Sequence, residues 1–434
     1  MKVSDLGRKE LKNAGWLICG KVAQMLLALL VSTWSARYLG PSDFGLINYG
    51  NTFTSFFMAF CTLGINSVII KEFVDAPEQV GRTIGTALLL RAVSSLLSAA
   101  FIVGIVSVVD YGEPITIAVV ALCSISLLFH VLDTFNYWFQ YQYRSKVTAI
   151  AGLAAYIATA AYRIVLLMQG KSVQWFAFAL SVDYIVLGVV LVIAYKRSGG
   201  PGLSFSWDYG KRLLKKSYHY ILSGMMVAIY GQTDKLMLKQ MVDEVSVGYY
   251  SVATTISGMW VFILGAIIDS MYPTILRLHK VGKPAFERKN RQLYAIVFYM
   301  STLVSLGFMV LGDLAIWILY GEAYLPASAS LKIVTWYTAF SYLGVARNAW
   351  IVCEGKQKYL KYIYLGAAVL NVGMNLLLIP LWGAAGAAVA SLLTQISTSM
   401  ILPCCIKELR PNAALMLQAI LLRDIKEKPS SGTE

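Results

Sequence analysis

Charged side chains interrupt several of the long apolar segments of this chain. Arg91, Arg163, Arg347, Lys21 and Lys332 each lie inside such a segment. A cation at the centre of a lipid-facing helix costs about 2.5 to 3.5 kcal/mol on insertion scales, so it is expected to face water, a partner or a ligand. A planar guanidinium suits phosphate or carboxylate oxygens. We therefore predict that Arg91, Arg163, Arg347 and Lys21 bind an anionic substrate; the alternative is that they reach toward the nearest headgroups.

Acidic residues also occur in the apolar segments, at Asp133, Asp183, Asp234 and Asp269. A carboxylate inside a membrane span is costly, and such residues mark ion and proton pathways. Asp234 and Asp183 are the predicted coupling or gating residues. The alternative for each is a structural ion pair with a cation from a neighbouring span.

The sequence contains none of the catalytic or nucleotide-binding motifs GxxxxGK[ST], HExxH and GxSxG. Its three His residues are far apart, and its six Cys form no CxxC pair. We therefore predict no enzyme activity, no cofactor and no metal site. The Cys residues are expected to pack as small apolar side chains.

The apolar segments themselves are about 20 residues long, which is the length that spans a hydrocarbon core of roughly 30 Å as a helix. With 58% hydrophobic and 14% charged residues, the chain is too apolar for a soluble domain of this size. The composition predicts an all-α membrane protein with about twelve transmembrane helices. The predicted spans are residues 13–36, 44–70, 83–109, 115–138, 147–169, 173–195, 217–238, 247–275, 293–318, 326–353, 362–380 and 382–405.

Most of the 37 Lys and Arg residues fall in every second gap between the spans. Short loops rich in Lys and Arg remain on the cytoplasmic side, so both termini are predicted to be cytoplasmic. The net charge of +14 is then explained by topology and by anionic lipid headgroups, and no nucleic-acid partner is predicted.

The longest basic gap, residues 196–216, has Gly, Pro and Ser near its centre and divides the spans six and six. The predicted organisation is a six-helix bundle at 1–195, a cytoplasmic linker at 196–216, a second six-helix bundle at 217–405 and a cytoplasmic tail at 406–434. Within the tail, residues 411–428 are too short and too charged to span, and an interfacial amphipathic helix is expected there.

The two halves repeat one another after their first spans. With one residue inserted, ARYLGPSDFGLINYG (36–50) aligns with the segment that follows the seventh span, so that Arg37 matches Lys239 and Gly45 matches Gly248. Both first spans start on the same side, so the repeat is parallel, about an axis along the membrane normal. A cleft between two bundles is expected from such a repeat.

Three motifs resemble the polysaccharide flippases of the Wzx type, within the multidrug, oligosaccharidyl-lipid and polysaccharide exporter (MOP) superfamily. They are ARYLGPSDFGLINYG (36–50), TDKLMLKQMVDEVSVGYYSVA (233–253) and WGAAGAAVASLLTQ (382–395). With the twelve-span organisation, the resemblance extends to about residue 405 and implies a fold of two bundles like that of the MATE transporters. Gln395 stands where many members carry an acid, so no proton-carrying role is assigned to the last span.

The resemblance implies a flippase of the bacterial inner membrane. Its substrate would be an undecaprenyl-diphosphate-linked oligosaccharide, moved from the inner to the outer leaflet for O-antigen or capsule assembly by cation-coupled alternating access. Expected partners are this lipid-linked oligosaccharide, membrane lipids, a polysaccharide polymerase and a chain-length regulator. The alternatives are a multidrug or cation exporter of the same superfamily and a membrane polysaccharide polymerase or ligase. The last would need a large outer loop, which no gap provides.

Overall fold

The computed structural model describes the backbone of residues 3–423 and the side chains of that range except those of 3–28, 222, 223, 227 and 230. This range is helical and contains no strand. The α-helices are α1 (Val3–Thr62), α2 (Ile69–Asp75), α3 (Val80–Val109), α4 (Pro114–His130), α5 (Thr134–Tyr141), α6 (Ser145–Met168), α7 (Val173–Ala177), α8 (Ala179–Arg197), α9 (Trp207–Met241), α10 (Glu244–Gly258), α11 (Val261–Val281), α12 (Lys283–Tyr320), α13 (Ala327–Cys353), α14 (Leu360–Ile396), α15 (Leu402–Cys405) and α16 (Arg410–Ile420), with a π-helical turn, η6, at Ser397–Ile401.

The apolar segments form the helices expected of them, so the prediction of an all-α membrane protein is confirmed. Each of the twelve predicted spans falls on one helix or on consecutive helical pieces. In the described part of the chain, seven helical stretches are long and apolar enough to cross a membrane. They are Pro77–Val109, Pro114–Tyr141, Ser145–Met168, Val173–Arg197, Val261–Val281, Lys283–Tyr320 and Gln357–Cys405.

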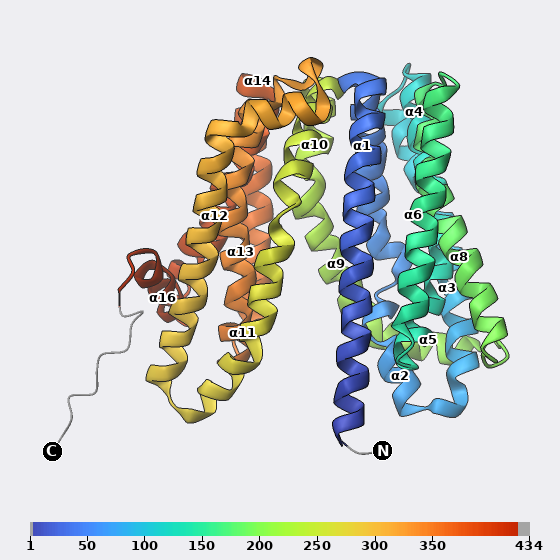
Figure 1. Ribbon diagram of the computed structural model, residues 1–434, viewed down its shortest axis with the longest axis horizontal. Coiled ribbons are helices and arrows are strands. Elements are labelled where there is room, and N and C mark those ends of the chain that lie inside the picture. Colours follow the sequence, from blue (N-terminus) through green and yellow to red (C-terminus); the bar gives the residue numbers. More distant parts are fainter. Residues whose placement is uncertain (1–2, 424–434) are drawn as a thin grey trace. The chain divides into compact units, whose positions relative to one another are not determined.

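The chain packs as two compact units, Met1–Gln232 and Thr233–Glu434, with the boundary inside α9. In the first unit α4 packs against α3 and α8, and α6 packs against α1 and α8 (Figure 1). Its main apolar core lies toward the ends of α3 and α8 that adjoin α2 and α5. Ile69, Phe73, Ile84, Phe139 and Leu191 are fully or almost fully buried there.

In the second unit α12 and α13 lie side by side, and α13 also packs against α10 and α14 (Figure 1). The helix expected in the tail at residues 411–428 is present as α16, and residues 424–428 lie outside the described residues. Leu415 and Met416 are buried in the main core of this unit. The Asn412 amide donates to the Tyr294 hydroxyl (2.7 Å), which fastens α16 to α12. One face of α16 is therefore packed on the second unit.

Both aligned segments of the sequence repeat interrupt a helix at the same point. In α1 the break is at Gly40, whose φ of 73° is in the left-handed region, and the following Pro41 lacks an N–H for the helix. In the second half α9 ends at Met241 and α10 starts after Asp243. There the Asp243 carboxylate accepts a hydrogen bond from the Ser246 N–H (2.7 Å) and caps α10.

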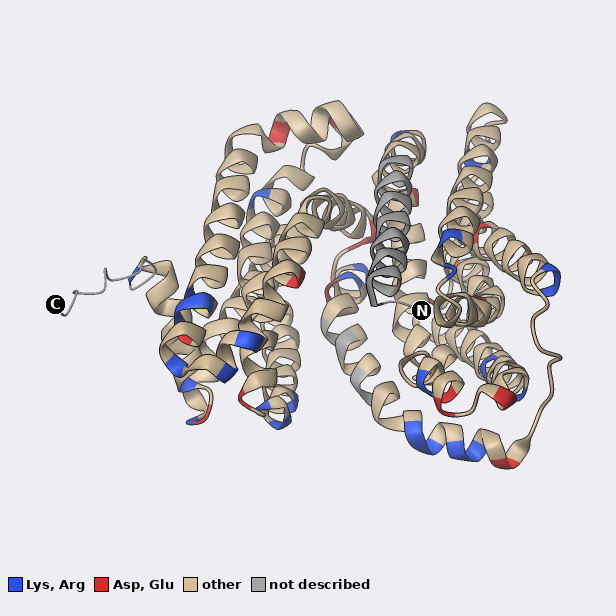
Figure 2. Ribbon diagram, turned by 60° about the horizontal axis from the view of Figure 1, so that its bottom comes forward, with Lys and Arg blue, Asp and Glu red and all other residues tan. Residues whose placement is uncertain are grey.

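Residues 200–217, which include most of the predicted linker, pack on the first unit. The Ser204 N–H donates to the Gly81 carbonyl (3.3 Å), and the Ser206 N–H donates to the Thr86 hydroxyl (3.2 Å). Several basic residues then follow one another along the start of α9 (Figure 2). Residues 200–217 are therefore packed on α3 and do not form a free loop.

Candidate functional site

A cavity of about 230 Å³ lies inside the first unit, among α1, α6 and α8. Arg163 and Asp183, predicted from the sequence as binding and coupling residues, both line it. The Thr159 hydroxyl, one helical turn before Arg163, donates to the Asp183 carboxylate (3.5 Å). The buried Nε–H of Arg163 has no hydrogen-bond partner among the described residues. The cavity therefore places a guanidinium group and a carboxylate on the same wall. The remaining lining residues are Val31, Ser32, Tyr156, Ala160 and Leu180.

Arg91 is in the same unit but outside this cavity. Its side chain on α3 is 1% exposed. The guanidinium donates to the Thr134 hydroxyl (2.7 Å) and to His130, through the carbonyl oxygen (3.3 Å) and ring Nδ1 (3.0 Å). Because Nδ1 accepts this bond, the His130 ring is assigned as neutral, with its proton on Nε2. The nearby Asp133 offsets part of the Arg91 charge. These contacts join α3 to the turn between α4 and α5.

Arg347 lies on α13 in the second unit and is 2% exposed. One of its guanidinium N–H groups donates to the Thr398 carbonyl oxygen (2.8 Å). Thr398 belongs to the π-helical turn η6, where the wider backbone loop leaves carbonyls free to accept from side chains. Arg347 therefore binds the backbone of the last span. Lys332, on the same helix, pairs instead with Asp313 (2.9 Å).

Asp234 on α9 is the centre of a polar cage within the second unit. Its carboxylate is 5% exposed and accepts four hydrogen bonds. The amides of Asn371 (3.1 Å) and Asn375 (2.6 Å) donate to Oδ1, and the hydroxyls of Tyr250 (2.6 Å) and Ser391 donate to Oδ2. Hydrogen bonds to a charged group are roughly twice as strong as neutral ones, so these four donors stabilise a buried anion. We name these five residues the Asp234 cage.

The geometry of α14 explains how the cage assembles. Asn371 and Asn375 are four residues apart and share one face of the helix. The chain then turns at Pro380 and Gly383, where φ is 53° and ψ is −127°. After this turn, a Cβ at Gly386 would lie 2.1 Å from the Leu378 carbonyl oxygen, so only Gly permits the close return. Ser391 is thereby carried back to the carboxylate.

Sequence reasoning identified Asp234 but missed its cage partners Tyr250, Asn371, Asn375 and Ser391. The two Asn residues carried a usable signal, because amides four residues apart inside an apolar span are rare and face one way. The sequence carried no such signal for Tyr250 and Ser391. Lys21, predicted as a binding residue, lies outside the side chains that the structure describes.

Within the part of the chain that the structure describes, residues that could hold a metal through nitrogen, sulfur or several carboxylates are not clustered. Over the described residues, no group of three or more His, Cys, Asp or Glu side chains comes together. The Asp234 cage instead collects oxygen atoms from a carboxylate, two amides and two hydroxyls, and the buried Oδ1 of Asn375 has no partner among the described atoms. Oxygen donors of this kind suit hard cations.

The fold matches that of solved transporters. One is a multidrug resistance MATE family transporter of the MOP superfamily in an inward-facing conformation, with a TM-score of 0.67 and 14% identity, covering 91% of this chain and 96% of that one. Another is the lipid II flippase MurJ, with a TM-score of 0.71 and 13% identity, covering 93% of this chain and 90% of that one. The predicted MATE-like fold is confirmed.

The family is shown by sequence. The model of the family described as "Polysaccharide biosynthesis protein" matches residues 11–279. Similar proteins include the capsular polysaccharide biosynthesis protein CapF of Staphylococcus aureus, 21% identical, with 88% of this chain and 96% of that protein covered. An Escherichia coli K12 protein named as an O-antigen transporter is 21% identical, with 90% and 95% covered. This chain belongs to the polysaccharide biosynthesis protein family, and the resemblance inferred from the three motifs is confirmed.

Proposed function

We propose that the chain is a flippase that moves an undecaprenyl-diphosphate-linked oligosaccharide from the inner to the outer leaflet of a bacterial inner membrane. The observation that carries the proposal is the near full-length similarity to capsule and O-antigen proteins on a transporter fold. The Arg163 cavity adds to it, because a guanidinium group in its lining suits diphosphate or acidic-sugar oxygens better than a cationic drug. A polysaccharide polymerase and a chain-length regulator are its proposed partners.

Transport is proposed to be coupled to a cation at the Asp234 cage. Four donors now face the carboxylate. A half-turn of the Asn371 and Asn375 amides would exchange their N–H groups for oxygens, and the two hydroxyls can rotate to offer lone pairs. The same residues would then hold Na⁺ by its preferred oxygen ligands. Asp183, which shares the other cavity with Arg163, is a proposed gating residue.

The proposed substrate is tested by reconstituting the purified chain in liposomes with a fluorescent undecaprenyl-diphosphate oligosaccharide and measuring its movement between leaflets. The parent protein is expected to accelerate this movement. Arg163→Ala should slow it by about tenfold to a hundredfold, the range for loss of a hydrogen bond to a charged group. Arg163→Lys should recover only part of the rate, because Lys keeps the positive charge but lacks the planar guanidinium that binds two oxygens at once.

Arg197→Ala is the matched control, because Arg197 is exposed at the last residue of α8, about four helical turns beyond Asp183 of the cavity. It should leave the rate unchanged. Equal rates in the Arg163→Ala variant and the parent would remove Arg163 from the substrate path. Efficient export of a lipophilic cation with no movement of the glycolipid would favour the multidrug exporter.

The proposed topology has both termini and residues 196–216 on the cytoplasmic side, and we expect alkaline phosphatase fused within 196–216 to be inactive. Loops dense in Lys and Arg resist translocation, so the enzyme would remain in the reducing cytoplasm. A fusion in the loop at residues 169–172, on the opposite side in this topology, should be active and is the control. Activity from the 196–216 fusion would reverse the assignment.

A further inference from the structure

The segment of residues 203–218 is a short non-helical stretch followed by the first turns of α9. It lies on the first unit and is held there by side chains as well as by the backbone. The Tyr209 hydroxyl donates to the buried Glu72 carboxylate (3.1 Å) and lies 2.8 Å from the Thr83 hydroxyl. Lys216 Nζ pairs with the other Glu72 oxygen at 2.5 Å. The segment is therefore fixed on α2 and α3.

One face of this helical segment makes that attachment. Tyr209, Gly210, Leu213 and Ser217 are buried, and their spacing places them on one side of the helix. Gly210 allows a close approach, since a Cβ there would lie 3.3 Å from the Thr86 side chain. The inward face therefore has its partner in the first unit.

The opposite face carries a stripe of aromatic and basic side chains that we name the linker stripe: Trp207, Lys211, Lys215 and Tyr218. All four are exposed, and they follow one another at intervals of four, four and three residues. Lys211 Nζ lies 5.7 Å from the centre of the Trp207 ring. Two more apolar side chains, Leu203 (49% exposed) and Phe205 (47% exposed), continue the surface before the helix.

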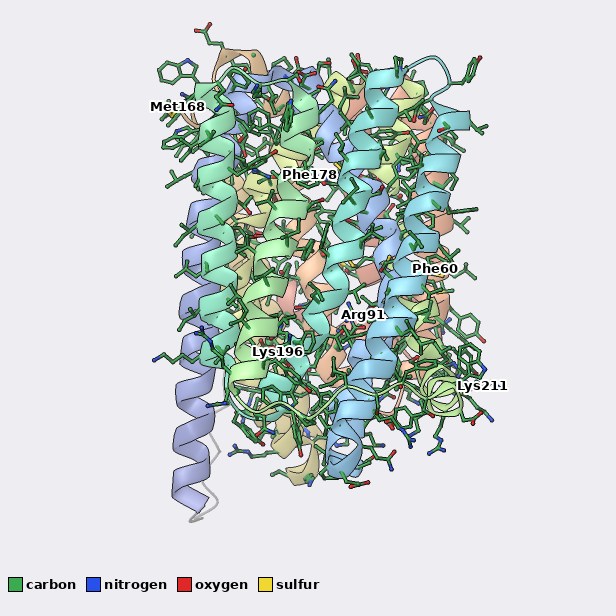
Figure 3. The ribbon with its side chains drawn as sticks, turned by 90° about the vertical axis from the view of Figure 1, so that its right-hand side faces the viewer. Phe60, Arg91, Met168, Phe178, Lys196 and Lys211 are labelled. Atoms are coloured by element: carbon green, nitrogen blue, oxygen red, sulfur yellow. The ribbon has the colours of Figure 1, made fainter. Side chains whose placement is uncertain are left out.

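The orientation of the segment suits a surface rather than a span. In Figure 3 the helix beside Lys211 is seen nearly end-on, whereas α3 runs along its length in the same view. The start of α9 therefore crosses the end of the first bundle instead of continuing parallel to it. A helix that lies across the ends of membrane spans is placed at the level of the headgroups.

We propose that the linker stripe, with Leu203 and Phe205, is a binding surface for anionic phospholipid headgroups of the cytoplasmic leaflet. The side chains of the linker stripe and the anionic lipid headgroups are chemically complementary. Trp and Tyr side chains favour the interface between headgroups and acyl chains, and each Lys near an anionic leaflet adds about fivefold in binding. Asp208 is the one acidic residue between 203 and 218, so the surface is strongly positive. The proposal rests on the cytoplasmic placement of this linker, which the phosphatase fusions test separately.

The test uses the full chain in nanodiscs of phosphatidylcholine alone or of phosphatidylcholine mixed with phosphatidylglycerol, with hydrogen–deuterium exchange of the peptides covering 203–218 as the measurement. Exchange should be at least about fivefold slower with phosphatidylglycerol, as expected for one engaged cation, and high salt should remove the difference. The double variant Lys211→Gln/Lys215→Gln should lose the protection.

Lys196→Gln/Arg197→Gln is the matched control, because it removes two exposed cations at the end of α8 and leaves the stripe intact. It should keep the protection. Equal exchange in both lipid mixtures, or undiminished protection in the Lys211/Lys215 variant, would overturn the proposal. Protection by soluble glycerol phosphate in phosphatidylcholine discs, equal to that by phosphatidylglycerol, would identify an isolated phosphate site and would also overturn it.

Discussion

Replacing Asp234 by Asn is expected to reduce gradient-driven transport to the level of protein-free liposomes. The substitution removes the only charge of the Asp234 cage and turns one acceptor into a donor that faces the donors of Tyr250, Ser391, Asn371 and Asn375. A cage without its anion has no group to balance a bound cation. Leaflet exchange of the fluorescent glycolipid, driven in turn by a Na⁺ gradient and a proton gradient, is the measurement.

Two observations separate a coupling role from a structural one. Asp208→Asn makes the same change on the same helix at an exposed position, and it should leave transport unchanged. If Asp234 only stabilises the fold, its Asn variant should instead be lost from the membrane or unfold at lower temperature, because the buried donors of the cage would lack their acceptor. A well-folded Asp234→Asn protein that transports at the rate of the parent under either gradient would contradict the coupling role.

Replacing Gly85 by Ala should release the linker from α3. A Cβ at Gly85 would lie 2.4 Å from the Ser204 carbonyl oxygen, and neighbouring Gly81 meets the Gly202 carbonyl at 2.1 Å in the same way. Overpacking of this kind costs about 1 to 3 kcal/mol, more than the roughly 1 kcal/mol that Ala contributes to a helix relative to Gly. We expect a lower unfolding temperature and faster trypsin cleavage after Lys211 and Arg212.

Gly104 provides the control on the same helix. A Cβ at Gly104 meets no other atom within 4 Å, so Gly104→Ala should be neutral or stabilising. An unfolding temperature and a cleavage rate for Gly85→Ala that match those of Gly104→Ala would mean that the linker does not depend on its close contact with α3.

The sequence alone predicted the elements and the class of this protein. Helix-length apolar segments, cations in alternate gaps and three motifs were sufficient to predict an all-α membrane protein of the polysaccharide biosynthesis family with a MATE-like fold. These features are local, since the thickness of a bilayer sets the length of a span and loop charge sets its direction. The free-energy cost of a charged group inside a span can also be recognised from the local sequence. Asp234, Arg163 and Asp183 could therefore be selected before their surroundings were known.

Only the tertiary structure decided which of these groups meet. Arg163 and Asp183 share a cavity, whereas Arg91 binds His130 and Thr134 outside it. The Asp234 cage needs Ser391, which is 157 positions away and returns through the turn at Gly383. The linker, rich in Gly and Ser, packs tightly because Gly81 and Gly85 lie on one face of α3. Such contacts depend on the rotation and crossing of helices, and those are set by packing between distant segments rather than by the hydropathy of any one of them.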